Sequence, residues 1–238
     1  MRGLLLVIGL AIFGISCERI DGCINASGDR ILTQRIASPF YAIDLRISAT
    51  LNLEVDTSLT EPDIELIAQE NLHENISVET LDGVLTIDFN DCIDQHEEVF
   101  INVKTPVLGS VIISGPGLIQ TSEIIRQPEF TVVGNASGDC NILVDVDRLN
   151  VYSYGSGELT FSGYAQSSII EINTSADYYG YDLLADTMDI FINASGNAQV
   201  RVEDELNAFV NASGNIYFKG SPLINQTGTG SGQILEDN

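Results

Sequence analysis

Acidic side chains recur at a fixed interval in the second half of the chain. Asp139, Glu158 and Asp177 follow one another at intervals of 19 residues, each directly after a Ser-Gly or Ser-Ala pair. If each interval is one coil of a stacked β structure, their carboxylates form a column with a spacing of about 4.8 Å. The column is a solvated acidic edge, a calcium site built from carboxylate oxygens, or a set of catalytic carboxylates. The sequence favours the solvated edge and leaves the other two alternatives open.

Tyrosines crowd the same half of the chain. Outward-facing tyrosines could stack on sugar rings or dock a protein. The candidate ligand-binding residues are Tyr152, Tyr154, Tyr178, Tyr179 and Tyr181. We prefer the alternative that these rings pack in the core or in aromatic ladders, and the alternation does not assign each ring to a face.

The charge balance and the scarcity of bases limit the function. With 34 acidic and 10 basic residues the formal net charge is −24, so nucleic acid would be repelled. Residues 114–238 contain no histidine and one lysine, Lys219, so a basic proton acceptor is scarcely available. The acidic cluster around His96, at 91–98, is predicted to be a charged loop rather than a metal site. We therefore expect no catalytic activity and no cofactor other than the calcium considered above.

The N-terminal stretch "MRGLLLVIGLAIFGISC" has the pattern of a secretory signal. Its apolar run is too short to cross a bilayer comfortably, which predicts a signal peptide at 1–16. The ending resembles a bacterial lipobox, so Cys17 is the predicted lipidation site; the alternative is an ordinary cleaved signal with Cys17 incidental. Residues 17–36 are predicted to be a tether; the alternative is a first partial coil of the β structure. Cys23, Cys92 and Cys140 could form one disulfide, and the sequence does not select the pair.

Strand patterns begin near Phe40. Apolar and polar residues alternate strictly over 43–56, which predicts a strand with one buried face. Asp82-Gly83 stands between two further strand-like runs, a strong hairpin signal. No segment shows helical periodicity of comparable strength. The sequence therefore predicts an all-β fold with a hairpin-containing N-terminal β region at 37–110.

Residues 111–238 repeat a Ser-Gly turn at intervals of 18 to 23 residues, with Ser175-Ala176 filling one gap. Each turn lies between short strand patterns, which predicts a β-solenoid with one coil per repeat, packed with 37–110 as one unit. Glycine is expected to supply positive φ at these turns, and serine to bond the turn backbone. At Ala176 we expect either a less tight turn or strain passed on to Asp177. The turn-forming residues are Ser137, Gly138, Ser156, Gly157, Ser195, Gly196, Ser213, Gly214, Ser231 and Gly232.

Asparagines occupy one position of several repeats and could stack as an amide ladder. They are Asn135, Asn173, Asn193 and Asn211.

The combination of motifs resembles one family. "SGNIYFKGSP" at 213–222, the preceding Ser-Gly turns, and "FYAIDLRISATLNLEV" followed by an Asp-Gly hairpin are similar to the auto-transporter adhesin head GIN domain family of Bacteroidetes. The resemblance covers roughly 35–238. It implies a right-handed parallel β-helix akin to pectin-lyase folds, on exported or lipid-anchored proteins for which adhesion is proposed. The chain departs from the family pattern in its Asn-Ala-Ser-Gly turns and at Ala176.

Taken with the resemblance, the sequence predicts an exported outer-membrane lipoprotein that serves as a binding or adhesion module at the cell surface. The expected partner is a glycan or a surface or matrix protein, and the membrane is contacted only through the lipid on Cys17. One alternative is a carbohydrate-active β-helix enzyme that uses the acidic column. A second alternative is a structural protein of the envelope.

Overall fold

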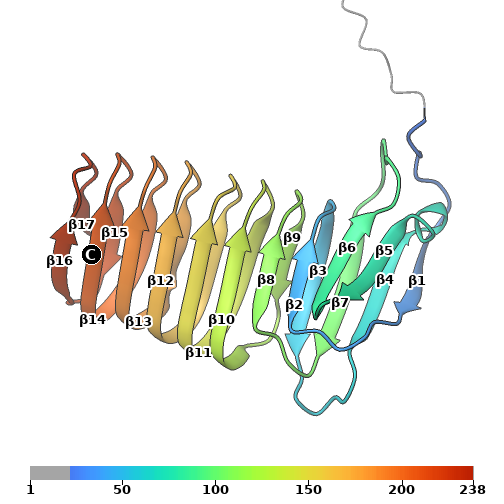
Figure 1. Ribbon diagram of the computed structural model, residues 1–238, viewed down its shortest axis with the longest axis horizontal. Helices are drawn as coiled ribbons and strands as arrows, with labels where there is room; N and C mark the ends of the chain where they lie inside the picture. Colours follow the sequence, from blue (N-terminus) through green and yellow to red (C-terminus); the bar gives the residue numbers. More distant parts are fainter. Residues whose placement is uncertain (1–21, 238) are drawn as a thin grey trace, which may run out of the picture.

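The computed structural model describes residues 22–237, so the predicted signal peptide and Cys17 lie outside the described residues. Regular structure in this range consists of strands and one 3-10 turn, Glu70–Leu72. Among these residues, no helix is long and apolar enough to span a bilayer. The strands line up along one axis, with the N-terminal region at one end and the last coils at the other (Figure 1).

The strands form two faces that enclose a single core, and the long strands of the solenoid bend from one face to the other. Inward side chains are apolar and almost fully buried, and outward ones are polar or half-buried, as period-two alternation requires. The strands are β1 (Arg30–Arg35), β2 (Ala42–Leu45), β3 (Ala49–Val55), β4 (Asp63–Gln69), β5 (Ile76–Leu81), β6 (Val84–Phe89), β7 (Val99–Thr105), β8 (Ser110–Ile113), β9 (Leu118–Thr121), β10 (Ile125–Gly134), β11 (Asp139–Ser153), β12 (Leu159–Ile172), β13 (Tyr178–Ile192), β14 (Ala198–Val210), β15 (Ile216–Lys219), β16 (Leu223–Thr227) and β17 (Ile234–Glu236).

The C-terminal part is a parallel β-solenoid of about 7 turns. Each coil runs along the first face, rounds a corner, returns along the second face and reverses at a Ser-Gly turn. The last full coil shows this plainly, because β14 pairs with β15 through its first half and with β16 through its second half. The Ser-Gly turns follow the strand tips along one edge, the upper one in Figure 1, which we call the turn edge. The predicted all-β solenoid is confirmed.

The N-terminal part continues both faces as a mixed sheet. On the first face, β9 pairs in parallel with β3 and β3 with β7, and then β4 and β1 follow in antiparallel order. On the second face, β2 pairs in parallel with β6, and β5 and β6 form an antiparallel hairpin. The hairpin turns at Asp82 (φ 50°) and Gly83 (φ 76°), where the two positive values match a two-residue hairpin loop. The hairpin prediction is therefore confirmed.

The segment predicted to be a tether contains a strand. β1 closes the first face by pairing along its length with β4. The disulfide Cys23–Cys92 fixes the residues that precede β1 to the loop before β7. Cys140 is a buried free thiol. The short sequence of β1 carries little local signal, since its register partners in β4, from Gln69 for Arg30 to Ile64 for Arg35, lie far along the chain. The sequence left the cysteine pairing open because spacing alone does not report which thiols the fold brings together.

The turn glycines serve a purpose other than the predicted one. None of the glycines in the predicted Ser-Gly pairs has positive φ; in the solenoid that conformation occurs at Gly163 and Gly220 near the opposite corner, and at Gly228 directly after β16. The reason for glycine at the turns is close stacking, because a Cβ on Gly157 would lie 1.8 Å from the carbonyl oxygen of Gly138. The backbone of each coil thus occupies the space that a side chain in the next would need.

Ala176 alters the stacking of its own coil. At the glycine turns, the N–H of Gly196 donates directly to the carbonyl of the preceding coil, and Gly214 does the same. In the coil of Ala176 the hydroxyl of Thr174 comes between the two backbones. It accepts from Ala176 N–H at 3.2 Å and donates to the Gly155 carbonyl at 2.6 Å. The Thr174 hydroxyl thus bridges the two turns in place of the direct backbone hydrogen bond seen at Gly196 and Gly214.

Candidate functional site

Asp139 and Asp177 of the predicted acidic column accept backbone hydrogen bonds along the turn edge, and from Asp177 onward these bonds form a ladder. Asp139 Oδ1 accepts from the Glu158 backbone N–H at 2.7 Å, and Asp177 Oδ1 accepts from that of Asn197 at 2.7 Å. The ladder continues through Asn197 and Asn215 with the same geometry. Each of these side chains satisfies a backbone donor in the next coil, a local role that a sequence pattern does not distinguish from ion binding.

Calcium binding by the column stays a prediction. Residues 22–237 contain no group of three or more His, Cys, Asp or Glu side chains that could hold a metal ion.

The five candidate tyrosines do not share one surface. Tyr178 is 1% exposed and stacks on Phe161 with ring centroids 5.5 Å apart, and burial raises its pKa. Tyr181 donates to Asp237, and the Lys219 ammonium lies 4.3 Å from its ring centroid. Tyr154, at 52% exposure, stands alone at the turn edge.

Tyr152 and Tyr179 lie on opposite faces. Tyr152 lies in the row of Glu171 and Phe191 on the second face, whereas Tyr179 lies in the row of Gln199 on the first face. The tyrosines therefore do not form a binding platform together.

The predicted asparagine ladder forms over three consecutive coils. Asn193 donates to Asn173 at 2.9 Å, and Asn211 donates to Asn193 at 2.8 Å. The coil of Tyr154 lies between Asn135 and the other three, as the turn hydrogen bonds of Asn135, Tyr154 and Asn173 to successive coils show. Asn135 is therefore outside the ladder.

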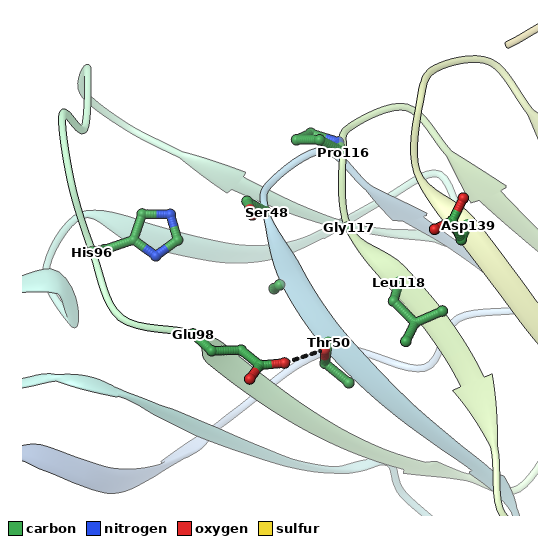
Figure 2. A pocket seen from close by; sticks show the side chains of 9 residues that line it. Ser48, Thr50, His96, Glu98, Pro116, Gly117, Leu118 and Asp139 are labelled. Atoms are coloured by element: carbon green, nitrogen blue, oxygen red, sulfur yellow. Dashed lines mark hydrogen bonds between the residues drawn. The ribbon is translucent and has the colours of Figure 1, made fainter. Parts of the chain in front are cut away.

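A hollow of about 300 Å³ opens at the turn edge, where the N-terminal region meets the first coils of the solenoid (Figure 2). We call it the turn-edge pocket. It lies at the start of β3 and β9 and at the loop that leads into β7. Its polar lining residues are Ser48, Thr50, His96, Glu98 and Asp139, and its apolar ones are Ala49, Pro116 and Leu118. The pocket thus brings Asp139 of the acidic column together with His96 and Glu98 of the charged loop.

The polar groups of the pocket differ in how much of their hydrogen-bonding capacity is already used within the protein. Glu98 Oε1 accepts from Thr50 Oγ1 at 2.8 Å, and Asp139 uses Oδ1 in its backbone hydrogen bond. His96 Nδ1 lies 2.6 Å from the Glu97 carbonyl oxygen, which can only accept, so Nδ1 carries the proton and Nε2 remains free. The ion pairs of residues 22–237 include neither Glu98 nor Asp139. Two carboxylates without a basic partner therefore face the hollow beside an imidazole.

The loop that carries His96 is held by the segment before β1. The Cys23–Cys92 disulfide joins the two, and the N–H groups of Ile24 and Ala26 donate to the carbonyls of Cys92 and Gln95 at 2.8 and 2.9 Å. Sequence reasoning placed this loop and the acidic column in separate features. They meet only through the strand pairing of the first face, which no local signal reports.

Comparison with known proteins finds a matching family and solved structures with a similar fold. Residues 40–222 match the family described as "Putative auto-transporter adhesin, head GIN domain", and none of the curated proteins matches the chain. A crystal structure of a putative adhesin from Bacteroides fragilis is 20% identical, with a TM-score of 0.83 over 90% of this chain and 100% of that one. A putative lipid binding protein from Parabacteroides distasonis is 19% identical, with a TM-score of 0.75 over 90% and 99%.

A putative adhesin from Parabacteroides merdae is 20% identical, with a TM-score of 0.67 over 90% of this chain and 99% of that one. At these identities the solved structures show a shared fold, and the family match extends over most of the chain. The resemblance found in the Ser-Gly turns is confirmed, and the protein belongs to the putative auto-transporter adhesin, head GIN domain family.

Proposed function

We propose that the protein is an exported, lipid-anchored binding module of the cell surface that holds its ligand at the turn-edge pocket without chemical conversion. The observation that carries the proposal is the gathering of Glu98, Asp139 and His96 around one hollow on a rigid β edge. Small-molecule and glycan sites are concave and carry a few convergent polar groups. Family membership supports adhesion as the purpose of such a site.

Export and anchoring are supported by the signal-like N-terminus and by the disulfide. Structural disulfides persist in oxidising compartments outside the cytosol, and Cys23–Cys92 joins the pocket loop to the segment that follows the predicted lipidation site. We propose that the lipid on Cys17 anchors the protein to the outer membrane, with the solenoid free to meet ligands.

The lining of the pocket favours a polar ligand. One structural neighbour is described as a putative lipid binding protein, but the hollow here is lined by carboxylates, hydroxyls and an imidazole, which an acyl chain would leave unsatisfied. A glycan or a polar protein segment offers the hydrogen-bond donors that these oxygens require. The preferred ligand of the pocket is therefore a glycan or a protein surface.

The same three side chains also support an enzymatic alternative. An imidazole and two carboxylates are groups that transfer protons in hydrolases. A hydrolase of this kind would use the turn-edge pocket rather than the whole acidic column. The test of function therefore includes a search for product.

The experiment is binding of the purified mature protein to a panel of glycans and matrix proteins, with and without calcium, while polysaccharides are monitored for chain cleavage. We expect saturable binding without product, and weaker binding by Glu98→Gln and His96→Ala. Cleavage that these variants abolish would establish the enzyme instead. If neither binding nor cleavage is detected, the role is that of a structural envelope protein.

A further inference from the structure

A row of polar side chains crosses the outer side of the first face at the N-terminal end. Gln34 and Asn102 both donate to Glu65, at 3.3 and 3.1 Å, Asn52 donates to Asn102 at 2.9 Å, and Gln120 donates to Asn52 at 2.8 Å. The row spans β1, β4, β7, β3 and β9 in strand order. It forms one hydrogen-bonded chain, which we call the polar row.

A second hollow, of about 170 Å³, lies beside the polar row on the side away from the turn edge. Its polar lining includes Asn52, Glu65 and Asn102 of the polar row. It also includes Glu54 and Lys104, which form an ion pair at 2.8 Å. The turn-edge pocket and this second hollow involve the same three strands, β7, β3 and β9, or the residues next to their ends. Thr50 of the first and Glu54 of the second both face outward on β3, about 13 Å apart along the strand. The two hollows and the row between them form one strip.

Two apolar side chains lie next to the polar row. Phe100 and Leu118 are the register partners of Thr50 on either side, and both are half-buried. The guanidinium of Arg30 lies 5.6 Å from the ring centroid of Phe100, whereas Leu118 lines the turn-edge pocket. Sugars present C–H faces that pack on apolar side chains and hydroxyls that pair with amides. Leu118 beside the amides of the polar row offers both kinds of contact.

The amides of the polar row keep unused hydrogen-bonding capacity. A primary amide has two N–H donors and two lone pairs on its oxygen. Asn52 spends one N–H on Asn102 and one lone pair on Gln120, so one donor and one acceptor remain for a ligand. Hydroxyl groups, which both donate and accept, fit this pattern.

The charges of the strip discriminate against acidic ligands. Glu98 and Asp139 lack an ion-pair partner within the described part of the chain. The cations near the strip are already paired, Lys104 with Glu54 and Arg30, which lies over Phe100, with Glu97. The net charge of −24 adds a long-range repulsion toward polyanions. A neutral ligand avoids both penalties.

We propose that the turn-edge pocket, the polar row and the second hollow together form an extended binding strip for an uncharged oligosaccharide. The proposal rests on the proposed binding function and specifies its ligand class. The strip is longer than one sugar ring, so affinity rises with chain length, and uronic acid oligomers are rejected.

The test is calorimetric titration of the protein with cellotetraose, mannotetraose, the tetramer of N-acetylglucosamine and tetragalacturonic acid, each compared with its monosaccharide. Gln120→Leu removes the amide at the end of the row between the two hollows. As the control, Asn211→Leu removes the terminal amide donor of the asparagine ladder, which lies outside the polar row and both hollows. Thermal unfolding of both variants shows whether the fold is kept.

We expect at least one neutral tetramer to bind at least tenfold more tightly than its monosaccharide. Loss of one hydrogen bond to the ligand in Gln120→Leu weakens that binding by about fivefold, and Asn211→Leu leaves it unchanged. The inference is overturned if no neutral tetramer binds, if length has no effect, if tetragalacturonic acid binds equally well, or if the two variants behave alike. Should Glu98→Gln still abolish binding of a panel ligand, the proposed function stands while this inference fails. If no panel ligand binds, both fail.

Discussion

Replacing Cys23 and Cys92 by serine tests how the pocket loop is held. The disulfide joins residues separated by 69 positions in the sequence. The loop-closure entropy of a crosslink of this length corresponds to about 4 kcal/mol at 25 °C. For a chain of this size, that loss lowers Tm by about 10 °C. The double variant should therefore unfold well below the oxidised wild type while keeping its far-ultraviolet circular dichroism.

The loss of order in the double variant should be greatest in the segments that the disulfide joins. Hydrogen exchange should rise at 22–28 and 90–98, because the backbone bonds of Ile24 and Ala26 to the pocket loop depend on the crosslink. The increase should be larger there than in β12 and β13, which lie away from the crosslink, and wild type treated with reductant should match the variant. A Tm within about 2 °C of the wild type, or unchanged exchange in the loop, would refute the reasoning that the disulfide holds the pocket.

Further predictions concern the stacked coils. Gly157→Ala should lower the free energy of unfolding by about 1–3 kcal/mol or more in denaturant titration, since its Cβ would meet the Gly138 carbonyl oxygen. As a control, Gly134→Ala, whose Cβ would make only ordinary contacts, should change that free energy by no more than about 1 kcal/mol. Asp177→Ala should cost about 1–3 kcal/mol by leaving the Asn197 N–H unpaired, whereas Asp177→Asn should cost little in the same titration. Burial raises the pKa of the Cys140 thiol from 9.0 to about 12, so folded protein should resist iodoacetamide at pH 8. The stability that depends on this thiol should be intact below pH 9 and fall by about 1.4 kcal/mol per pH unit between pH 9 and pH 10, above which the raised pKa of Tyr178 adds to the decline. Cys140→Ala should flatten the decline between pH 9 and pH 10, and equal slopes in that range would contradict the prediction.

The repeat architecture could be predicted because its signals are local. The Ser-Gly period marks the coil length, and Asp82-Gly83 marks the hairpin, each within a few residues of the structure that it specifies. The purpose of the turn glycines could not be predicted in the same way. Gly157 is required by the backbone of the neighbouring coil rather than by its own φ, and a sequence does not show how closely two coils approach.

The candidate site could be predicted only in pieces. Asp139 and His96 were both singled out from the sequence, but their shared pocket depends on parallel pairing between β3, β7 and β9. Tyr178 illustrates the opposite failure. Its neighbours in "DYYGYD" interrupt the alternation, and a register irregularity between β13 and β14 follows it, so the buried face could not be assigned without the structure.

Comparison of Asp139→Asn with Asp177→Asn tests the central claim most directly. Both aspartates accept a backbone N–H of the next coil at 2.7 Å, and asparagine keeps that acceptor while removing the charge. Only Asp139 lines the turn-edge pocket. We predict that Asp139→Asn changes the affinity for the ligand found on the panel and that Asp177→Asn leaves it at the wild-type value. Equal affinities for both variants and the wild type would contradict the assignment of binding to this pocket.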